Sequence, residues 1–251
     1  MNPLPYVMVA PTGARRSTAD HPTLPTRPDE IAQTARACFA AGAQALHLHV
    51  RDAAGRHSLD PGHYRDAIAA VTEAAPGMAI QVTTETAGRY GPAAQLALIR
   101  DLAPLWASVA LRELAADPSL ARRLYAMCRD QGTALQHIIY DAGDAARLGQ
   151  WQQEGVLGPN EDVILVLGRY DASHLARVED IAPFRASLPP VGRWMLCAFG
   201  PQEHACLHAA ARLGADVRVG FENALTDAKG TPWPNVESSV AALTHSWRTA
   251  A

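Results

Sequence analysis

The sequence lacks the features that mark extracellular, membrane and nucleic-acid-binding proteins. Its four cysteines are scattered, with no Cys-x-x-Cys pair, which is typical of a reduced protein. No apolar run approaches the roughly 20 residues that a membrane span needs, and residues 1–5 have neither the basic segment nor the apolar core of a signal peptide. There is no block of Lys or Arg, and a net charge of −3 with a pI near 6.3 gives no basic field to attract a polyanion. We therefore expect a soluble, cytoplasmic protein that binds neither nucleic acid nor membranes.

Short aliphatic runs alternate along the chain with segments of helical periodicity. The expected strands comprise residues 6–10, 45–50, 79–84, 107–111, 134–140, 163–167, 194–199 and 216–219. The expected helices comprise residues 29–41, 61–74, 92–102, 119–130, 144–153, 173–186, 202–213 and 235–248. Eight strand and helix units in 251 residues indicate an α/β fold of the (β/α)₈ TIM barrel type, forming a single domain over residues 1–251. A doubly wound open sheet is the alternative, but the first strand is not followed by the glycine fingerprint of a dinucleotide-binding fold.

Polar side chains occupy every second position at the end of the second expected strand. Alternate residues of a strand face the same side, so His47, His49 and Arg51 share one face and the aliphatic residues between them share the other. Residues two apart on a strand have Cα atoms roughly 6.5–7 Å apart, so two imidazoles can converge on one metal ion. A pair of hydrogen-bonded core histidines is the alternative, and it suits one isolated histidine better than two at ligand spacing. We therefore predict a metal site at His47 and His49.

Polar residues also follow the other expected strands, where a barrel carries its catalytic groups. In the last strand, Arg218, Gly220 and Glu222 share one register. Since the first strand of a closed barrel lies between the second and the last, Glu222 can approach His47 and His49 across a single strand. Two imidazoles and one carboxylate leave coordination positions open on a divalent ion, as in a catalytic zinc site. The alternative for Glu222 is a surface carboxylate paired with a nearby arginine.

Three motifs occur in the order and at the barrel positions of a known enzyme family. They are Pro11-Thr12-Gly13-Ala14, His47-Leu48-His49-Val50-Arg51-Asp52 and Val217-Arg218-Val219-Gly220-Phe221-Glu222. Through them the chain resembles, from end to end, the β-keto acid cleavage enzymes, whose founding activity is 3-keto-5-aminohexanoate cleavage. The resemblance implies a (β/α)₈ barrel that holds one zinc ion through His47, His49 and Glu222, with Arg218 as the catalytic arginine. It also implies that a β-keto acid and the co-substrate acetyl-CoA give acetoacetate and a new acyl-CoA, and it suggests a homo-oligomer.

The chain departs from this family at positions where the family keeps acidic residues or glycine. Asn223 stands where the family has its aspartate base, and an amide does not accept a proton at neutral pH. Arg15 replaces a frequent glutamate, and residues 136–138 read Gln-His-Ile instead of Glu-x-Glu. The third strand ends in Thr-Thr-Glu, with Glu85 last, instead of Thr-Gly-Gly. Either Glu85 has taken over proton removal or this branch handles another substrate or reaction, so the expected catalytic set is Arg218, Glu85 and Asn223.

The chemistry follows from these residue types. A metal ion with open positions can chelate the keto and carboxylate oxygens of a β-keto acid and acidify C2. A nearby carboxylate removes the C2 proton, the enolate attacks the thioester of acetyl-CoA, and Arg218 stabilises the developing charge. The expected substrate-binding residues lie at strand ends and are Thr12, Gly13, Arg15, Arg51, Thr83, Thr84 and Arg169. We expect Arg15, Arg16 or Arg51 to hold a substrate carboxylate and Arg169 to meet the CoA phosphates. Each threonine can instead bond its local backbone.

Two other functions fit the same pattern. The first is a metal-dependent hydrolase of the amidohydrolase type, for which His137 on the fifth strand gives partial support although the sixth strand has no histidine. The second is a small-molecule-binding barrel that has kept its metal and lost its base, as Asn223 allows. The identity of the β-keto acid does not follow from the sequence, because periodicity does not rank the loop residues around a pocket.

Overall fold

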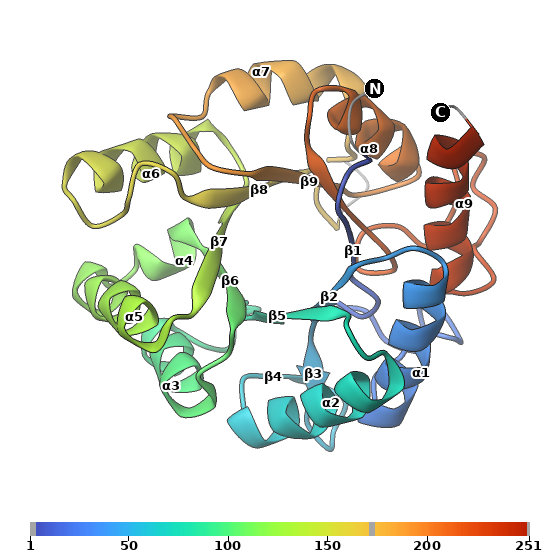
Figure 1. The fold of residues 1–251 in the computed structure, drawn as a ribbon, viewed down its shortest axis with the longest axis horizontal. Coiled ribbons are helices and arrows are strands. Elements are labelled where there is room, and N and C mark those ends of the chain that lie inside the picture. The colour runs from blue at the N-terminus through green and yellow to red at the C-terminus, as the bar shows by residue number, and fades with distance from the viewer. Residues whose placement is uncertain (1–3, 171–173, 250–251) are drawn as a thin grey trace.

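The strands of the chain close into a barrel. The computed structural model describes residues 4–170 and 174–249. In this part of the chain, eight parallel strands follow one another around the ring in the order β1, β10, β9, β8, β7, β6, β5, β2, and Figure 1 shows the helices surrounding them. The strands are β1 (Val7–Val9), β2 (Ala45–Leu48), β5 (Ala79–Thr83), β6 (Trp106–Ala110), β7 (Ala134–Ile139), β8 (Asp162–Leu167), β9 (Trp194–Ala198) and β10 (Asp216–Val219). The expected (β/α)₈ barrel is confirmed.

A main helix follows each barrel strand. These helices are α1 (Pro28–Ala40), α2 (Pro61–Ala74), α3 (Pro92–Leu102), α5 (Pro118–Gln131), α6 (Ala142–Gln153), α7 (Ile181–Ala186), α8 (Glu203–Arg212) and α9 (Val236–Thr249). The side chains of Asp60 and Asp117 accept N–H groups of the first turns of α2 and α5, and both helices have proline at their first position. Gly132 ends α5 with a φ of +74°, which glycine adopts without steric cost. Among the described residues, none of the helices combines the length and apolar character that a bilayer crossing requires.

Four short elements do not follow from the sequence pattern. They are β3 (Val50–Arg51), β4 (His57–Ser58), α4 (Leu111–Leu114) and the 3₁₀ turn η1 (Val178–Asp180). The strand expected over residues 45–50 ends at Leu48, because Val50 and Arg51 pair instead with β4 in an antiparallel hairpin. His49 therefore lies where the chain leaves the barrel wall.

The helix expected over residues 173–186 is wrong at its start, before residue 178. Residue 173 lies outside the described residues, and residues 174–177 are not helical. The backbone N–H of Ala176 instead donates to the carbonyl of Phe199 at 3.0 Å, which ties this segment to the end of β9. Amphipathic spacing does not reveal such a bond, because it depends on a strand far away in the sequence.

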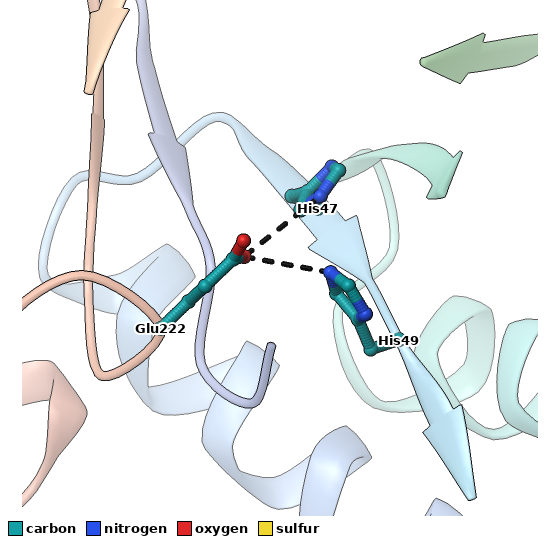
Figure 2. A group of neighbouring side chains, drawn as sticks. All are labelled: His47, His49 and Glu222. Carbon is teal, nitrogen blue, oxygen red and sulfur yellow. Dashed lines mark ion pairs between the residues drawn. The ribbon is translucent and has the colours of Figure 1, made fainter. Parts of the chain in front are cut away.

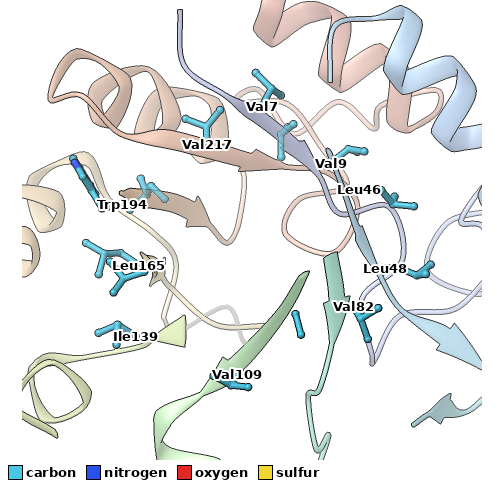
Figure 3. Close-up of a cluster of buried hydrophobic side chains, with 14 of the residues drawn as sticks. Val7, Val9, Leu46, Leu48, Val82, Val109, Ile139, Leu165, Trp194 and Val217 are labelled. Carbon is cyan, nitrogen blue, oxygen red and sulfur yellow. The ribbon is translucent and has the colours of Figure 1, made fainter. Parts of the chain in front are cut away.

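The barrel wall separates an outer and an inner apolar layer. Figure 3 shows outward-facing side chains of the strands, which pack against the helices. The inner layer consists of Met8, Ala45, Ala110, Ile138, Ile164, Val166, Met195, Cys197 and Phe199. Leu46 and Leu48 belong to the outer layer, and so do the valines on either side of Arg218. Because successive side chains of a strand alternate, His47 and Arg218 point into the barrel.

Candidate active site

The carboxyl end of the barrel brings together the two histidines and the glutamate of the sequence motifs. His47 lies in β2 and His49 directly after it, Glu222 follows β10, and β1 lies between the two strands. Nε2 of His47 lies 3.8 Å and Nε2 of His49 lies 3.5 Å from Oε2 of Glu222, as Figure 2 shows. All three residues are buried, and one ligand atom of each lies within 4.8 Å of the others. Glu222 thus meets the histidines across β1, in the arrangement that the strand registers predict.

The electrostatics of this cluster suit a divalent cation. Burial acts to raise the pKa of Glu222, but Arg218 and His49 outweigh it and lower that pKa, so the carboxylate is ionised at neutral pH. Burial, together with the charge of Arg218, holds the pKa of His47 well below its usual range, so its imidazole is neutral. In the described part of the chain, both ring nitrogens of His49 and Oε2 of Glu222 are buried without a hydrogen-bond partner. Buried polar atoms normally have a partner, and a metal ion bound here would supply one.

Gln81 fixes the orientation of His47. The two residues are paired across β2 and β5, and Oε1 of Gln81 lies 2.7 Å from Nδ1 of His47. The amide nitrogen of Gln81 donates in turn to Oε1 of Gln136 at 3.0 Å, which leaves the amide oxygen for the imidazole. Nδ1 of His47 therefore carries the proton, and Nε2 offers its lone pair toward Glu222. The motifs do not include Gln81, although its inward register opposite His47 was a signal for it.

Replacing Gln81 with leucine is expected to weaken metal binding about 10- to 100-fold, the usual effect of removing the partner of a ligating histidine. Leucine accepts no hydrogen bond from Nδ1 of His47, so the imidazole loses its fixed tautomer and orientation. Zinc titration against a competing chelator measures the change. Gln150→Leu, at an exposed position of α6, is the matched control. Wild-type metal affinity in Gln81→Leu would contradict this role.

Arg218 lies inside the barrel beside the glutamate. Its Nη2 donates to Oε1 of Glu222 at 3.2 Å and lies 3.3 Å from Sγ of Cys197. Glu222 thus turns Oε1 toward the guanidinium and Oε2 toward the two histidines. A buried guanidinium beside His47, His49 and Glu222 is placed to stabilise negative charge that develops on a bound substrate.

A cavity of about 220 Å³ opens beside this cluster. Pockets for drug-sized ligands measure roughly 300–1,000 Å³, so this one suits a smaller molecule. The residues of its lining that the sequence pattern singled out for the site are Arg15, His47, Thr83, Glu85, Arg169, Arg218 and Glu222. The other lining residues, to which the sequence pattern gave no role, are Arg112, Glu113, Ile138, Tyr140, Val166, Tyr170 and Phe199. The mixture of charged, aromatic and aliphatic side chains suits a small, charged organic ligand.

The chain is similar to one enzyme family along nearly its whole length. Residues 6–250 match the family model of the beta-keto acid cleavage enzyme. The chain belongs to this family. It is 24% identical over 240 residues to the 3-keto-5-aminohexanoate cleavage enzyme of Fusobacterium nucleatum subsp. nucleatum, covering 89% of this chain and 84% of that protein. It is 26% identical over 251 residues to the 3-oxoadipate:acetyl-CoA acetyltransferase of Cupriavidus necator, covering 94% of this chain and 87% of that protein.

Solved structures share the barrel at low sequence identity. A binary complex of ObcA with oxaloacetate matches 91% of this chain with a TM-score of 0.72 and 18% identity, and the chain spans 64% of that protein. A type I 3-dehydroquinate dehydratase from Clostridium difficile matches all of this chain and 94% of its own, with a TM-score of 0.63 and 7% identity. At these identities the likeness shows the fold alone.

The carboxylate of Glu85 lies in the lining of the cavity. Glu85 follows β5. Burial raises the pKa of its carboxyl group, the charge of His49 opposes that rise and the charge of Glu222 adds to it. Its backbone is fixed on both sides, since its N–H donates to Oγ1 of Thr83 at 3.1 Å and its carbonyl lies 2.8 Å from Nε2 of His57. Glu85 is therefore held in place as a group that can accept a proton.

His57 lies between Glu85 and the cluster of His47, His49 and Glu222. It lies on β4, and its ring centroid is 5.2 Å from that of His49. Burial lowers the pKa of His57 to about 3, so the ring is neutral and donates from Nε2 to the carbonyl of Glu85. The sequence pattern gave no sign of this contact, because the hairpin that carries His57 was not expected.

Arg51 holds the loop after β1 and does not line the cavity. Its guanidinium donates to the carbonyl oxygens of Gly13, Ala14 and Arg16. Gly13 has a φ of +64°, and a Cβ atom there would lie 2.7 Å from Cγ of Glu222, so only glycine lets the loop pack this closely. Substrate binding by Arg51 and Gly13 stays a prediction, and their contacts support a role in positioning Glu222.

Three other residues that the sequence singled out lie outside the cavity lining. The hydroxyl of Thr12 donates to the carbonyl of Pro25 and that of Thr84 to the carbonyl of Ser108, each at 2.9 Å. Both hydroxyls thus bond the backbone of other segments, 13 and 24 residues away in the sequence, and not the local backbone that was the alternative to substrate binding. The side chain of Asn223 is fully buried, and neither its oxygen nor its nitrogen has a hydrogen-bond partner in the described part of the chain. Catalysis by Asn223 stays a prediction, and its position favours Glu85 as the base.

Proposed function

We propose that this chain converts a β-keto acid and acetyl-CoA into acetoacetate and a new acyl-CoA. In an acid R–CO–CH₂–COO⁻, the bond between C2 and C3 breaks, C2 forms a bond to the acetyl group, and R–CO moves to the sulfur of CoA. The observation that carries the proposal is the buried set of His47, His49 and Glu222, with its unsatisfied ligand atoms, in a member of this family. The names of the two relatives above describe reactions of the same class.

The proposed metal is a single zinc ion held by His47, His49 and Glu222. Two neutral imidazoles and one carboxylate are a donor set that zinc favours, and they leave positions open for substrate. When bound, zinc acts as a Lewis acid that polarises the keto group and so acidifies C2. Gln81 and Arg51 support this centre by orienting His47 and by holding the loop that packs on Glu222.

Two residues of the chain carry the proposed proton and charge transfers. Glu85 takes the proton from C2 as C2 attacks the thioester carbonyl, and it returns a proton to C2 when acetoacetate leaves, so no net proton is consumed. Arg218 donates hydrogen bonds to the oxygen on which negative charge develops during that attack. The thiolate that acetyl-CoA releases then attacks the original keto carbon and becomes the new acyl-CoA.

The hydrolase alternative loses its support because His137 faces away from the site. Its neighbour Gln136 points into the barrel toward Gln81, so His137 points outward. There its Nδ1 lies 3.3 Å from the carbonyl of Asp162, and its ring centroid is 5.6 Å from that of Tyr125. The position of Glu85 in the cavity likewise favours catalysis over a barrel that only binds its ligand.

Incubating the zinc-loaded protein with acetyl-CoA and a panel of β-keto acids tests the function. We expect acetoacetate and a new acyl-CoA in equal amounts, and we expect their formation to stop on chelation and to resume on zinc addition. Release of a free acid without CoA would instead identify a hydrolase. Binding of the acids without any turnover would identify a binding protein, and either result would overturn the proposal.

A further inference from the structure

Four arginines line the cavity, and two of them have no acidic partner within the described part of the chain. Arg218 pairs with Glu222 at 3.2 Å, and Arg112 pairs with two aspartates after β7 at 2.5 and 2.6 Å. Among the residues that the structure describes, no carboxylate oxygen lies within 4.0 Å, the limit for an ion pair, of a side-chain nitrogen of Arg15 or Arg169. Arg15 is exposed, whereas Arg169 is half-buried. Arg169 is therefore the less hydrated of the two cations that lack an anion.

Arg169 is held ready for a ligand. It follows β8, its Nη1 donates to the carbonyl of Gly168 at 2.7 Å, and its Nη2 donates more weakly to the carbonyl of Tyr140 at 3.4 Å. Its guanidinium carbon also lies 5.0 Å from the ring centroid of Tyr140, and this cation–π contact adds to the two hydrogen bonds. A guanidinium has five N–H groups, so these contacts leave Nε–H and other donors for an anion. Little side-chain freedom remains to be lost when one binds.

Arg169 lies across the barrel from the metal cluster. In the ring of eight strands, β8 stands four places from β2, so Arg169 and His47 come from opposite sides of the barrel, as Figure 1 shows for their strands. The aliphatic side chains of Ile138 on β7 and Val166 on β8 line the cavity on the side of Arg169. His47 and Arg169 both line the cavity of about 220 Å³, which suits one small ligand. A β-keto acid held by its keto and carboxylate oxygens near His47 therefore extends its substituent along this wall to Arg169.

The surrounding charges favour an anion on the acid over the phosphates of CoA. A groove of about 360 Å³ that shares Arg169 with the cavity is also lined by Asp141, which pairs with Arg112, and by Asp180, whose charge repels phosphate. A cationic substituent would require a free carboxylate at this side of the barrel. Glu113 already accepts hydrogen bonds from a backbone N–H and two side chains, and Glu85 follows β5, which is next to β2.

We propose that the substrate of this chain is a β-keto diacid whose second carboxylate is bound by Arg169. The inference rests on the proposed function and adds the substrate class to it. A planar guanidinium binds a carboxylate through two parallel N–H···O bonds, so Arg169 fixes the end of the substituent while the cluster around His47 fixes the keto end. Arg169 then recognises the acid, which replaces the contact with CoA phosphates expected from the sequence.

Three 3-oxo acids of the same chain length, ending in a methyl group, a carboxylate or an aminomethyl group, test the proposal. The zinc-loaded protein is assayed with each acid at saturating acetyl-CoA. We expect kcat/KM for the diacid to exceed that for the other two about 10- to 100-fold, as a charged hydrogen-bonding pair provides. Arg169→Gln should raise KM for the diacid by about the same factor and leave KM for the methyl acid and for acetyl-CoA unchanged.

Arg177→Gln is the matched control, because Arg177 is an exposed arginine of the same loop and lies 3.6 Å from Glu179. We expect it to keep the wild-type preference. If Arg169→Gln raised KM for acetyl-CoA and not for the diacid, Arg169 would bind CoA and the proposal would be overturned. Equal or better turnover of the methyl acid by the wild type would overturn the substrate class alone. Failure to turn over any of the three acids would overturn the proposed function as well, so the two failures are distinguishable.

Discussion

The His47→Ala/His49→Ala double variant is expected to lose its metal and, with it, at least about a thousandfold in the rate of acyl transfer. Glu222 alone remains, and a single carboxylate does not hold zinc against dialysis, since structural and catalytic sites use at least three protein ligands. Lewis-acid polarisation of a keto group contributes several kcal/mol to catalysis, and each 1.4 kcal/mol or so is a factor of ten in rate. Elemental analysis after dialysis and the acyl-transfer assay measure the two losses.

The control for this variant is His208→Ala. His208 lies on α8, outside the barrel, so its replacement also removes an imidazole but leaves the cluster untouched. Added zinc should raise the Tm of the wild type and of His208→Ala, because zinc binds only the folded protein, and it should leave the Tm of the double variant unchanged. Full metal occupancy in the double variant would end the assignment of His47 and His49 as ligands.

The grouping of His47, His49 and Glu222 could be predicted from the sequence, because alternation and barrel closure leave these residues little freedom. His47 and Arg218 are flanked on both sides by aliphatic residues of the outer layer, so the period of two alone directs them inward. Closure of the ring then places β1 between β2 and β10, which brings Glu222 to the histidines. Each of these steps follows from strand geometry and does not depend on side-chain details.

The roles of the long side chains could not be predicted in the same way. Arg51 shares its parity with His49, yet the chain leaves the barrel between them, and its guanidinium finds three backbone carbonyls in the loop after β1. Arg169 was one of several strand-end arginines, and only the fold shows that it stands opposite β2 and lines the cavity. A long, flexible side chain can bond any of several partners within its reach, and here those partners come from segments distant in the sequence.

Contacts made by short hairpins and loops could not be predicted from the sequence either. His57 reaches Glu85 and the ring of His49 only because β3 and β4 form a hairpin outside the barrel. The two strands of this hairpin have two residues each, too few for a periodic signal. Residues 174–177 read as helical by their spacing, but they form no helix, and the backbone N–H of Ala176 bonds the end of β9 instead.

Replacing Glu85 with glutamine is expected to slow exchange of the C2 protons of a bound β-keto acid by about 10²- to 10⁴-fold, the usual contribution of a general base. Glutamine keeps the size of the side chain but does not accept a proton, so zinc content and acid affinity should stay at wild-type values. A base acts only when it is ionised, and burial raises the pKa of Glu85. The acid limb of kcat/KM in the wild type should therefore lie at a higher pH than the value of about 4.3 for an ordinary glutamate.

Two further variants decide whether Glu85 is the base. Glu73→Gln, at an exposed position of α2, removes a carboxylate far from the cavity and should leave exchange unchanged. Adding Asn223→Asp to Glu85→Gln should not restore exchange, because the side chain at 223 is fully buried outside the cavity lining and a carboxylate there has no path to C2. Restoration would show that a carboxylate at position 223 does reach C2. Wild-type exchange in Glu85→Gln itself would exclude Glu85 as the base. The same measurement on Glu113→Gln would then test Glu113, which also lines the cavity and lies outside the set of His47, His49 and Glu222. Burial raises the pKa of Glu113 to about 6.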